Sequence, residues 1–255
     1  MTFRFILYNS IIAAETMKTT NKKFFTKVVA FDADDTLWDC QTHFEKVQDE
    51  YCRLLSPWAD REQVLASLLA TEKGNMQLLG FGCKAFTMSL IENAIGVTGG
   101  RIGSGAIAEI LRMGKWLLSA PGTPLPDVVD TLERLKSRGG VRMIVFTKGE
   151  AIDQKSKMRR SGLSGYFDDM VITDEKSPDE YLRLCRMCRC RPEEMTMVGN
   201  SFKSDIAPAL AVGMKAIHIP FHTTWALEQT EEYEHPNLVK INHFSEILDC
   251  CCGEE

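Results

Sequence analysis

The chain lacks an apolar run long enough to cross a bilayer. A membrane-spanning helix needs about 20 consecutive apolar residues, and the apolar stretch from Phe5 to Ala14 is interrupted by Asn9 and Ser10. A secretory signal peptide would need a stronger positive flank than the single Arg4. We therefore expect no membrane partner, and we expect residues 1–26 to form a disordered N-terminal extension.

An excess of positive charge is also missing. The net charge is −5 and the isoelectric point is about 5.7, with both signs mixed along the sequence and no long block of one sign. Proteins that bind nucleic acids or membrane surfaces rely on a basic face, so neither partner is expected. The nine cysteines are an odd number without regular spacing, which favours reduced thiols and a cytoplasmic location.

Only one group of cysteines has spacing that suggests a metal site, Cys185-x-x-Cys188 with Cys190. A second ligand pair at zinc spacing is absent. Tyr181 and Leu184 share one helical face with Cys185 and Cys188, so the expected role of these thiols is core packing.

Short apolar runs are the strongest structural signal in the sequence. Runs of this length without polar interruption are typical of strands buried on both faces, as in parallel sheets. Five are present, at Lys27–Asp32, Val141–Thr147, Asp169–Thr173, Met195–Gly199 and Lys215–Ile219. Helical patterns lie between the later runs, and Ser177 before Pro178 has the chemistry of a helix start. This alternation predicts an α/β fold with a doubly wound parallel sheet.

One interval breaks the alternation. Between residues 39 and 120 four helical patterns occur without a strand run. An unstructured loop of that length is unusual in a compact domain, whereas an inserted helical subdomain is not. We therefore predict a core over 27–38 and 121–249, an all-helical insertion over 39–120, and an exposed C-terminal tail over 250–255.

Polar side chains follow the predicted strands where ligands of doubly wound sheets bind, at the carboxyl ends. The first strand ends in Asp32 and Asp34, which project to the same side of an extended chain. Two adjacent carboxylates need a cation or a shared proton between them. The later strands are followed by Thr147, Lys176, Asn200 and Asp205. Together these groups predict a site for a hard cation and a phosphate.

These segments resemble the four motifs of the haloacid dehalogenase-like (HAD) superfamily in order and spacing. The Asp-x-Asp-x-Thr motif is Asp32 to Thr36, the second motif is Thr147, the third is Lys176, and the acidic loop is Gly199 to Asp205. The resemblance extends from Lys27 to about Phe221. It implies a HAD-like Rossmannoid core, and the helical insertion is similar to the C1 cap of this superfamily.

Two positions depart from the superfamily pattern. The usual Lys-Pro of the third motif is Lys176-Ser177-Pro178, which shifts the proline by one residue and leaves the lysine in place. Asn200 stands where many members carry Asp. Its neutral oxygen can still bind Mg²⁺, but one negative charge is lost, so we expect weaker metal affinity.

The resemblance implies a two-step phosphoryl transfer. Asp32 would attack the phosphoryl group and form an aspartyl-phosphate. Asp34 would protonate the leaving alkoxide and then deprotonate the hydrolytic water. Thr147 and Lys176 would bind the phosphoryl oxygens. Because dehalogenases of this superfamily expel halide and generally lack the second aspartate, Asp34 favours phosphate chemistry.

The resemblance also implies Mg²⁺ as the cofactor. Its ligands would be Asp32, the main-chain carbonyl of Asp34, and either Asn200 or Asp205. The ion would screen charge between the nucleophile and the phosphate.

The expected partner is a small phosphorylated metabolite, with Lys148 and Lys84 as further anion contacts. His222 is expected to be an ordinary loop residue.

The alternative functions are a phosphomutase, a 2-haloacid dehalogenase and a non-catalytic phosphate-binding protein. The sequence leaves the substrate and the oligomeric state open.

Overall fold

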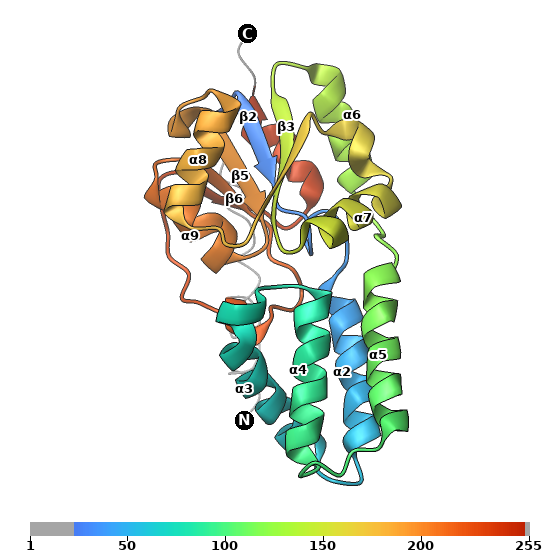
Figure 1. Ribbon diagram of the computed structural model, residues 1–255. Coiled ribbons are helices and arrows are strands. Elements are labelled where there is room, and N and C mark those ends of the chain that lie inside the picture. Colours follow the sequence, from blue (N-terminus) through green and yellow to red (C-terminus); the bar gives the residue numbers. More distant parts are fainter. Residues whose placement is uncertain (1–22, 253–255) are drawn as a thin grey trace, which may run out of the picture.

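The computed structural model describes residues 23–252 and consists of an α/β core with a bundle of helices at one end (Figure 1). The stretch from Phe5 to Ala14 lies outside the described residues. No helix within them combines the length and the apolar character that crossing a membrane requires.

The core is a six-stranded sheet in which every neighbouring pair is parallel. The strand order is β4-β3-β2-β5-β6-β7. The strands are β2 (Val28–Phe31), β3 (Arg142–Lys148), β4 (Asp169–Thr173), β5 (Met195–Gly199), β6 (Lys215–His218) and β7 (Leu238–Lys240). The five predicted strands and the doubly wound parallel sheet are confirmed. The three-residue β7 was not predicted, because it is too short to give an apolar run.

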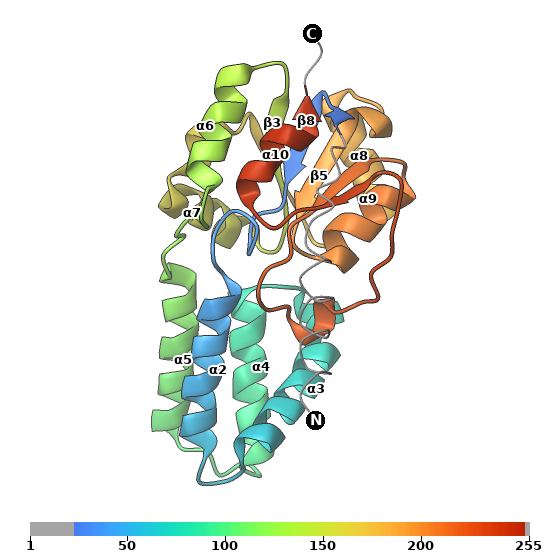
Figure 2. The same cartoon turned by 180° about the vertical axis from the view of Figure 1, so that it is seen from behind.

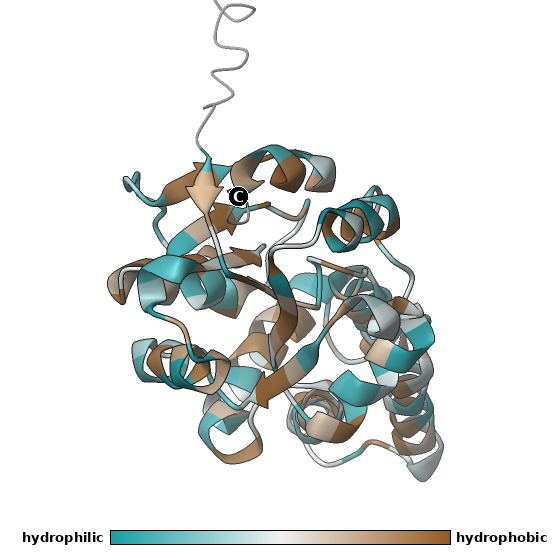
Figure 3. Ribbon diagram, turned by 90° about the horizontal axis from the view of Figure 1, so that it is seen from above, coloured by the Kyte–Doolittle hydropathy of each residue, from teal (hydrophilic) through white to brown (hydrophobic). Residues whose placement is uncertain are grey.

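Both faces of the sheet are covered by helices, as Figure 3 shows from above. Side chains of β2 alternate between the two faces: Val29 and Phe31 pack on one side, and Val28 and Ala30 on the other. The first face is covered by α6 (Val128–Arg138) and α10 (Ile247–Cys250), and α7 (Ala151–Ser161) also contributes to it. The second is covered by α8 (Pro178–Cys188) and α9 (Ala207–Ala211). This burial on both faces explains the uninterrupted apolar sequence of β2.

The predicted start of α8 is confirmed. The Ser177 hydroxyl accepts a hydrogen bond from the Glu180 N–H and Pro178 occupies the first turn. Tyr181, Leu184 and Cys185 are buried against the sheet, which is the packing role expected from the sequence.

The helical bundle comprises α2 (Gln41–Leu55), α3 (Arg61–Leu79), α4 (Cys83–Val97) and α5 (Ser104–Ser119). It has a hydrophobic core of its own, including Leu55, Leu68, Leu90 and Ile110, separate from the clusters on the sheet. The buried Tyr51 hydroxyl lies 2.7 Å from Asn93 Oδ1, so the polar end of this ring is satisfied. The helices predicted within the insertion are therefore present.

The two chain segments that join bundle and core run side by side as a neck. Trp38 forms a bridge with Pro124. The Asp39 N–H donates to the Thr123 carbonyl at 3.3 Å, and the Leu125 N–H donates to the Leu37 carbonyl at 3.0 Å. The bundle therefore enters and leaves the core at one place.

A long loop between β6 and β7, residues 219–237, extends from the core to the bundle (Figure 2). It contains the short helix η4 (Ala226–Glu228). Thr223 donates a hydrogen bond to Glu45 of α2 at 2.8 Å. The rings of Trp225 and Phe81 meet edge to face. The loop is a second connection between the two parts.

Two predictions about the chain ends are wrong. Residues 24–25 form β1 (Phe24–Phe25), which pairs in parallel with β8 (Cys251–Cys252), so the extension predicted as disordered through residue 26 is ordered from 23 onward. Cys250 and Cys251, predicted to be exposed, are buried. Each of these two-residue strands depends on a partner far away in the sequence, so neither leaves a local signal.

The packing of α6 on the sheet gives a stability prediction. Leu132 is fully buried, so Leu132→Ala is expected to lower the free energy of unfolding by about 2–5 kcal/mol. Leu78→Ala is the matched control, because Leu78 is 85% exposed. Urea denaturation measures both, and an equal loss in the two variants would contradict this account of the core.

Candidate active site

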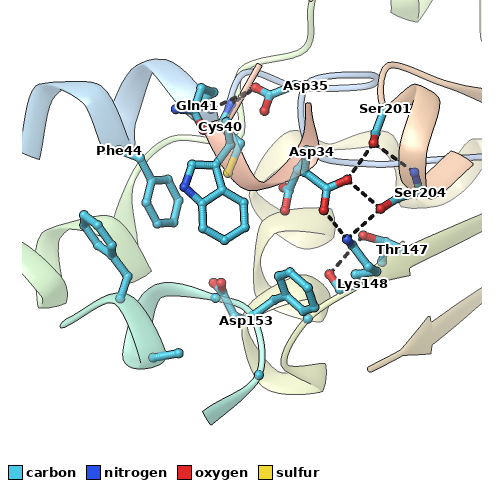
Figure 4. Close-up of a pocket in the computed structure, with 18 of the residues that line it drawn as sticks. Asp34, Asp35, Cys40, Gln41, Phe44, Thr147, Lys148, Asp153, Ser201 and Ser204 are labelled. Atoms are coloured by element: carbon cyan, nitrogen blue, oxygen red, sulfur yellow. Dashed lines mark hydrogen bonds and ion pairs between the residues drawn. The ribbon is translucent and has the colours of Figure 1, made fainter. Parts of the chain in front are cut away.

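A cavity of about 200 Å³ lies between the bundle and the carboxyl ends of the strands. Six of the predicted site residues line it, namely Asp32, Asp34, Thr147, Lys148, Asn200 and Asp205. Figure 4 shows Asp34 with Thr147 and Lys148 of the sheet on one side and Phe44 of α2 on the other. Sheet, bundle and the 219–237 loop all contribute lining residues.

The turn after β2 places the two aspartates. The Asp32 N–H donates to the Val198 carbonyl at 2.8 Å, which extends the ladder between β2 and β5 by one residue. The chain then turns sharply at Asp35, whose φ is 63°; aspartate tolerates this left-handed conformation better than most residues. Asp35 Oδ1 accepts the N–H groups of Cys40 and Gln41 at 2.8 Å each and so fixes the start of α2.

Lys176 joins two carboxylates beneath the cavity. Its Nζ lies 2.5 Å from Asp32 Oδ1 and 2.6 Å from Asp205 Oδ1, and the lysine is 4% exposed. Burial alone would lower the pKa of Lys176, but Asp205 and Asp32 raise it above its ordinary value, so the ammonium stays charged. Burial and the Asp205 carboxylate raise the pKa of Asp32 by more than Lys176 lowers it.

Asp205 lies on a π-helical turn, η3 (Phe202–Ile206), which leads directly into α9. Its Oδ2 accepts the Ser201 N–H at 2.9 Å. The carboxylate also touches the backbone of Gly199, where an added Cβ would lie 2.3 Å from Asp205 Oδ2. The close approach of Asp205 to β5 therefore requires glycine at 199.

Asn200 is held by Thr36 and His218. The Thr36 hydroxyl donates to Asn200 Oδ1 and accepts the Asn200 N–H, both at 3.1 Å. His218 Nε2 lies 3.0 Å from the Asn200 carbonyl, which fits an imidazole protonated at Nε2. Burial lowers the pKa of His218, which favours the neutral ring. His218 belongs to no sequence motif and was not predicted, and His222 does not line the cavity.

Asp34 has a different set of partners from Asp32. It accepts hydrogen bonds from Trp38 Nε1 at 2.7 Å and Gln154 Nε2 at 2.8 Å, and Lys157 Nζ lies 3.0 Å from its Oδ2. Burial would raise the pKa of Asp34, but Lys157, Gln154 and Trp38 lower it below its ordinary value. None of these three partners was predicted, because Gln154 and Lys157 on α7 look like the solvent-facing surface of any helix and Trp38 belongs to no motif.

Thr147 and Lys148 are the last two residues of β3. Thr147 is buried and lines the cavity. The Lys148 ammonium lies 2.7 Å from Glu228 Oε1. It also donates to the Ser204 hydroxyl at 2.8 Å (Figure 4). Glu228 Oε2 also accepts the Ser201 hydroxyl at 2.6 Å. Lys148, which was expected to contact the anion of the substrate, therefore binds a carboxylate of the protein itself. Glu228 supplies this carboxylate from the 219–237 loop, where no sequence motif marks it.

Lys84 lies outside the cavity lining. Its ammonium pairs with Glu150, and its side chain is 52% exposed. The structure therefore does not bring it to the phosphate side of the cavity.

Within residues 23–252 no three His, Cys, Asp or Glu side chains gather as a metal-binding cluster. The set predicted for Mg²⁺ has only two carboxylate side chains, Asp32 and Asp205, completed by an amide and a main-chain carbonyl. These two carboxylates share the Lys176 ammonium.

The contact between Gly199 and Asp205 can be tested directly. Gly199→Ala is expected to displace the Asp205 carboxylate and to lower both the melting temperature and any activity of the site. Gly74→Ala is the control, because an added Cβ there meets nothing within 4 Å, and alanine within α3 should stabilise the protein by about 1 kcal/mol. Thermal unfolding of both variants measures this; a Gly199→Ala protein as stable as the parent would refute the contact.

The same motifs and fold occur in known proteins. The family model for haloacid dehalogenase-like hydrolases matches residues 26–213. A structure of a haloacid dehalogenase-like family hydrolase from Xanthomonas campestris is 30% identical, with a TM-score of 0.78, covering 87% of this chain and 88% of that one. A 2-haloacid dehalogenase from Pseudomonas syringae shares the fold at 22% identity and a TM-score of 0.60, covering 88% of this chain and 97% of that one.

Among named enzymes, the glyceraldehyde 3-phosphate phosphatase of Methanothermobacter thermautotrophicus is 32% identical over 131 residues, which are 49% of this chain and 58% of that protein. The N-acylneuraminate-9-phosphatase of Mus musculus is 30% identical over 95 residues, 35% of this chain and 38% of that enzyme. These matches span less than two thirds of either relative. The family model covers most of the chain and the Xanthomonas structure nearly all of it, and the chain belongs to the haloacid dehalogenase-like hydrolases.

Proposed function

We propose that this protein is a Mg²⁺-dependent phosphatase that hydrolyses a small phosphorylated metabolite through an aspartyl-phosphate intermediate. The observation that supports it most strongly is the contrast between Asp32 and Asp34. Both carboxylates line one cavity, but Asp32 contacts Lys176 and Asp34 contacts Lys157. Neighbouring carboxylates with separate partners are suited to different chemical roles.

Asp32 is the nucleophile in this proposal. Its carboxylate ends the central strand and opens into the cavity, and its Oδ1 is fixed by Lys176 at 2.5 Å. A nucleophile oriented by a buried cation attacks with little reorganisation. Thr147, at the adjacent strand end, binds a phosphoryl oxygen, and Lys176 stabilises the charge that develops there.

Asp34 is the acid and base. Lys157, Gln154 and Trp38 hold its carboxylate in one orientation and keep it ionised in the free protein. A phosphate dianion in the cavity raises the pKa of this carboxyl, because it places like charge nearby. The protonated group then donates to the leaving oxygen, and the resulting carboxylate takes a proton from the attacking water.

The strand ends also fit a hard divalent cation. Asp32 and Asp205 are buried carboxylates that share one ammonium, and the pKa of Asp32 is raised in part because Asp205 is so near. Such excess negative charge among oxygen donors is characteristic of Mg²⁺ sites. Asp32, the Asp34 carbonyl, and Asn200 or Asp205 would hold the ion, which screens the charge between nucleophile and phosphate when bound.

The bundle closes the cavity from the opposite side and, in this proposal, acts as the cap that selects the substrate. The two phosphatases above act on glyceraldehyde 3-phosphate and on an N-acylneuraminate 9-phosphate. Small phosphate monoesters of this kind are the substrate class that we propose for this chain.

The nucleophile can be tested by phosphate release from a panel of phosphate monoesters with Mg²⁺. The parent protein is expected to release phosphate from at least one, and Asp32→Asn to release none, because the amide cannot form the aspartyl-phosphate. Lys84→Met serves as the control, since Lys84 lies outside the cavity. Full activity in Asp32→Asn would refute the nucleophile; transfer of phosphate back to substrate would identify a phosphomutase.

The acid role of Asp34 predicts a dependence on the leaving group. Asp34→Asn should reduce kcat at least about 10²-fold for alkyl phosphates. The loss should be much smaller for p-nitrophenyl phosphate, because its leaving group departs without a proton. Measured kcat values for the two substrate types decide this, and equal losses on both would contradict general acid catalysis by Asp34.

A further inference from the structure

The part of the cavity that the bundle forms carries almost no charge. Its lining residues are Gln41, Phe44, Gln48, Glu72, Asn75, Met76, Gly80, Phe81, Gly82, Ala85, Phe86 and Ser89. No lysine, arginine or histidine occurs among them, and Glu72 is the single ionisable group. All lysines of the lining belong to the core, where Lys148 pairs with Glu228 and Lys157 with Asp34.

Glu72 has no ionic or hydrogen-bonding partner among residues 23–252. It lies on α3 one turn before Asn75, so both side chains face the same way. The Asn75 amide is already engaged, because its Nδ2 donates to the Ser89 hydroxyl at 3.1 Å and to Glu92 Oε2 at 2.7 Å. Burial without a compensating cation raises the pKa of Glu72 to about 7. A half-buried polar group of this kind needs a partner that the protein itself does not supply.

We propose that Glu72 determines specificity by accepting a hydrogen bond from a hydroxyl on the substrate and by rejecting substrates that carry a second anionic group. The inference rests on the proposed function, since the phosphate must lie at the strand ends for the rest of the substrate to reach the bundle. The side chains of Gln41 and Gln48 support a hydroxylated substrate, because within the described part of the chain they too have no hydrogen-bonding partner and can bind neutral hydroxyls.

The negative charge of Glu72, in a part of the cavity without a cation, also explains why a substrate with a second anionic group would be rejected. Above the pKa of Glu72 of about 7, a carboxylate on the substrate would face an ionised Glu72 in a partly dehydrated space without a cation to compensate it, and like charges in such surroundings repel strongly. A hydroxyl in the same place satisfies the Glu72 carboxyl whether it is ionised or not, because that group accepts a hydrogen bond in both states. Phosphate esters of neutral polyols are therefore the expected class.

Two substrates with the same carbon skeleton test this. Glycerol 3-phosphate ends in a hydroxymethyl group where 3-phosphoglycerate has a carboxylate. At pH 8.5, above the pKa of Glu72 of about 7, the parent protein is expected to favour glycerol 3-phosphate at least about tenfold in kcat/KM, a ratio that corresponds to about 1.4 kcal/mol. Glu72→Gln removes the charge and keeps the size, so it should raise kcat/KM for 3-phosphoglycerate and bring the ratio to within about threefold.

Glu62→Gln is the matched control, because Glu62 lies on the same helix, is exposed and does not line the cavity. It makes the same change of net charge and should leave the tenfold preference intact. An unchanged ratio in Glu72→Gln, or a parent protein that prefers 3-phosphoglycerate, would overturn the role of Glu72.

Calorimetric binding of the two compounds to Asp32→Asn, with and without Glu72→Gln, separates this inference from the proposed function. The same shift in the ratio of dissociation constants is expected there, although no turnover occurs. Absence of turnover in the parent protein together with that shift would refute the phosphatase and support Glu72. A binding ratio independent of residue 72 would refute Glu72 even if phosphate is released.

Discussion

The active site depends on one buried ammonium group. Lys176 contacts the carboxylates of Asp32 and Asp205 and so ties together the segments that follow β4, β2 and β5. Removing one partner from such a buried ionic group typically costs about 3–5 kcal/mol, because it leaves a charge without compensation. The contacts of Lys176 that hold the strand ends together therefore also orient the proposed nucleophile.

Asp34 is only two residues from Asp32 but belongs to a different electrostatic environment. Its partners come from the neck and from α7, whereas those of Asp32 come from the segments after β4 and β5. The sharp turn at Asp35 brings Trp38 back to Asp34. Two identical side chains in one short motif thereby acquire opposite pKa shifts, with the pKa of Asp32 raised and the pKa of Asp34 lowered.

The sequence was sufficient to predict the sheet, the inserted helices and the strand-end residues, because each has a local signature. Buried parallel strands give apolar runs, and the two carboxylates proposed to be catalytic directly follow one. Lys157, His218 and Glu228 could not be predicted in this way. Their contacts reach Asp34, Asn200 and Lys148 across the fold, and their sequence neighbours show no motif. The pairing of β1 with β8 was not predicted either, because it joins residues near opposite ends of the chain and so leaves no local pattern.

The neck between core and bundle has a mechanical consequence. Since the entering and leaving segments bond to each other, both covalent connections of the bundle lie at one place, and the 219–237 loop adds noncovalent contacts. The size of the bundle can therefore change without altering the register of the sheet. Trp38 belongs to this neck and also donates its indole N–H to Asp34. A displacement of the neck would therefore move one of the three donors to Asp34, whereas Gln154 and Lys157 belong to α7 of the core, so the position of the neck and the pKa of Asp34 are coupled.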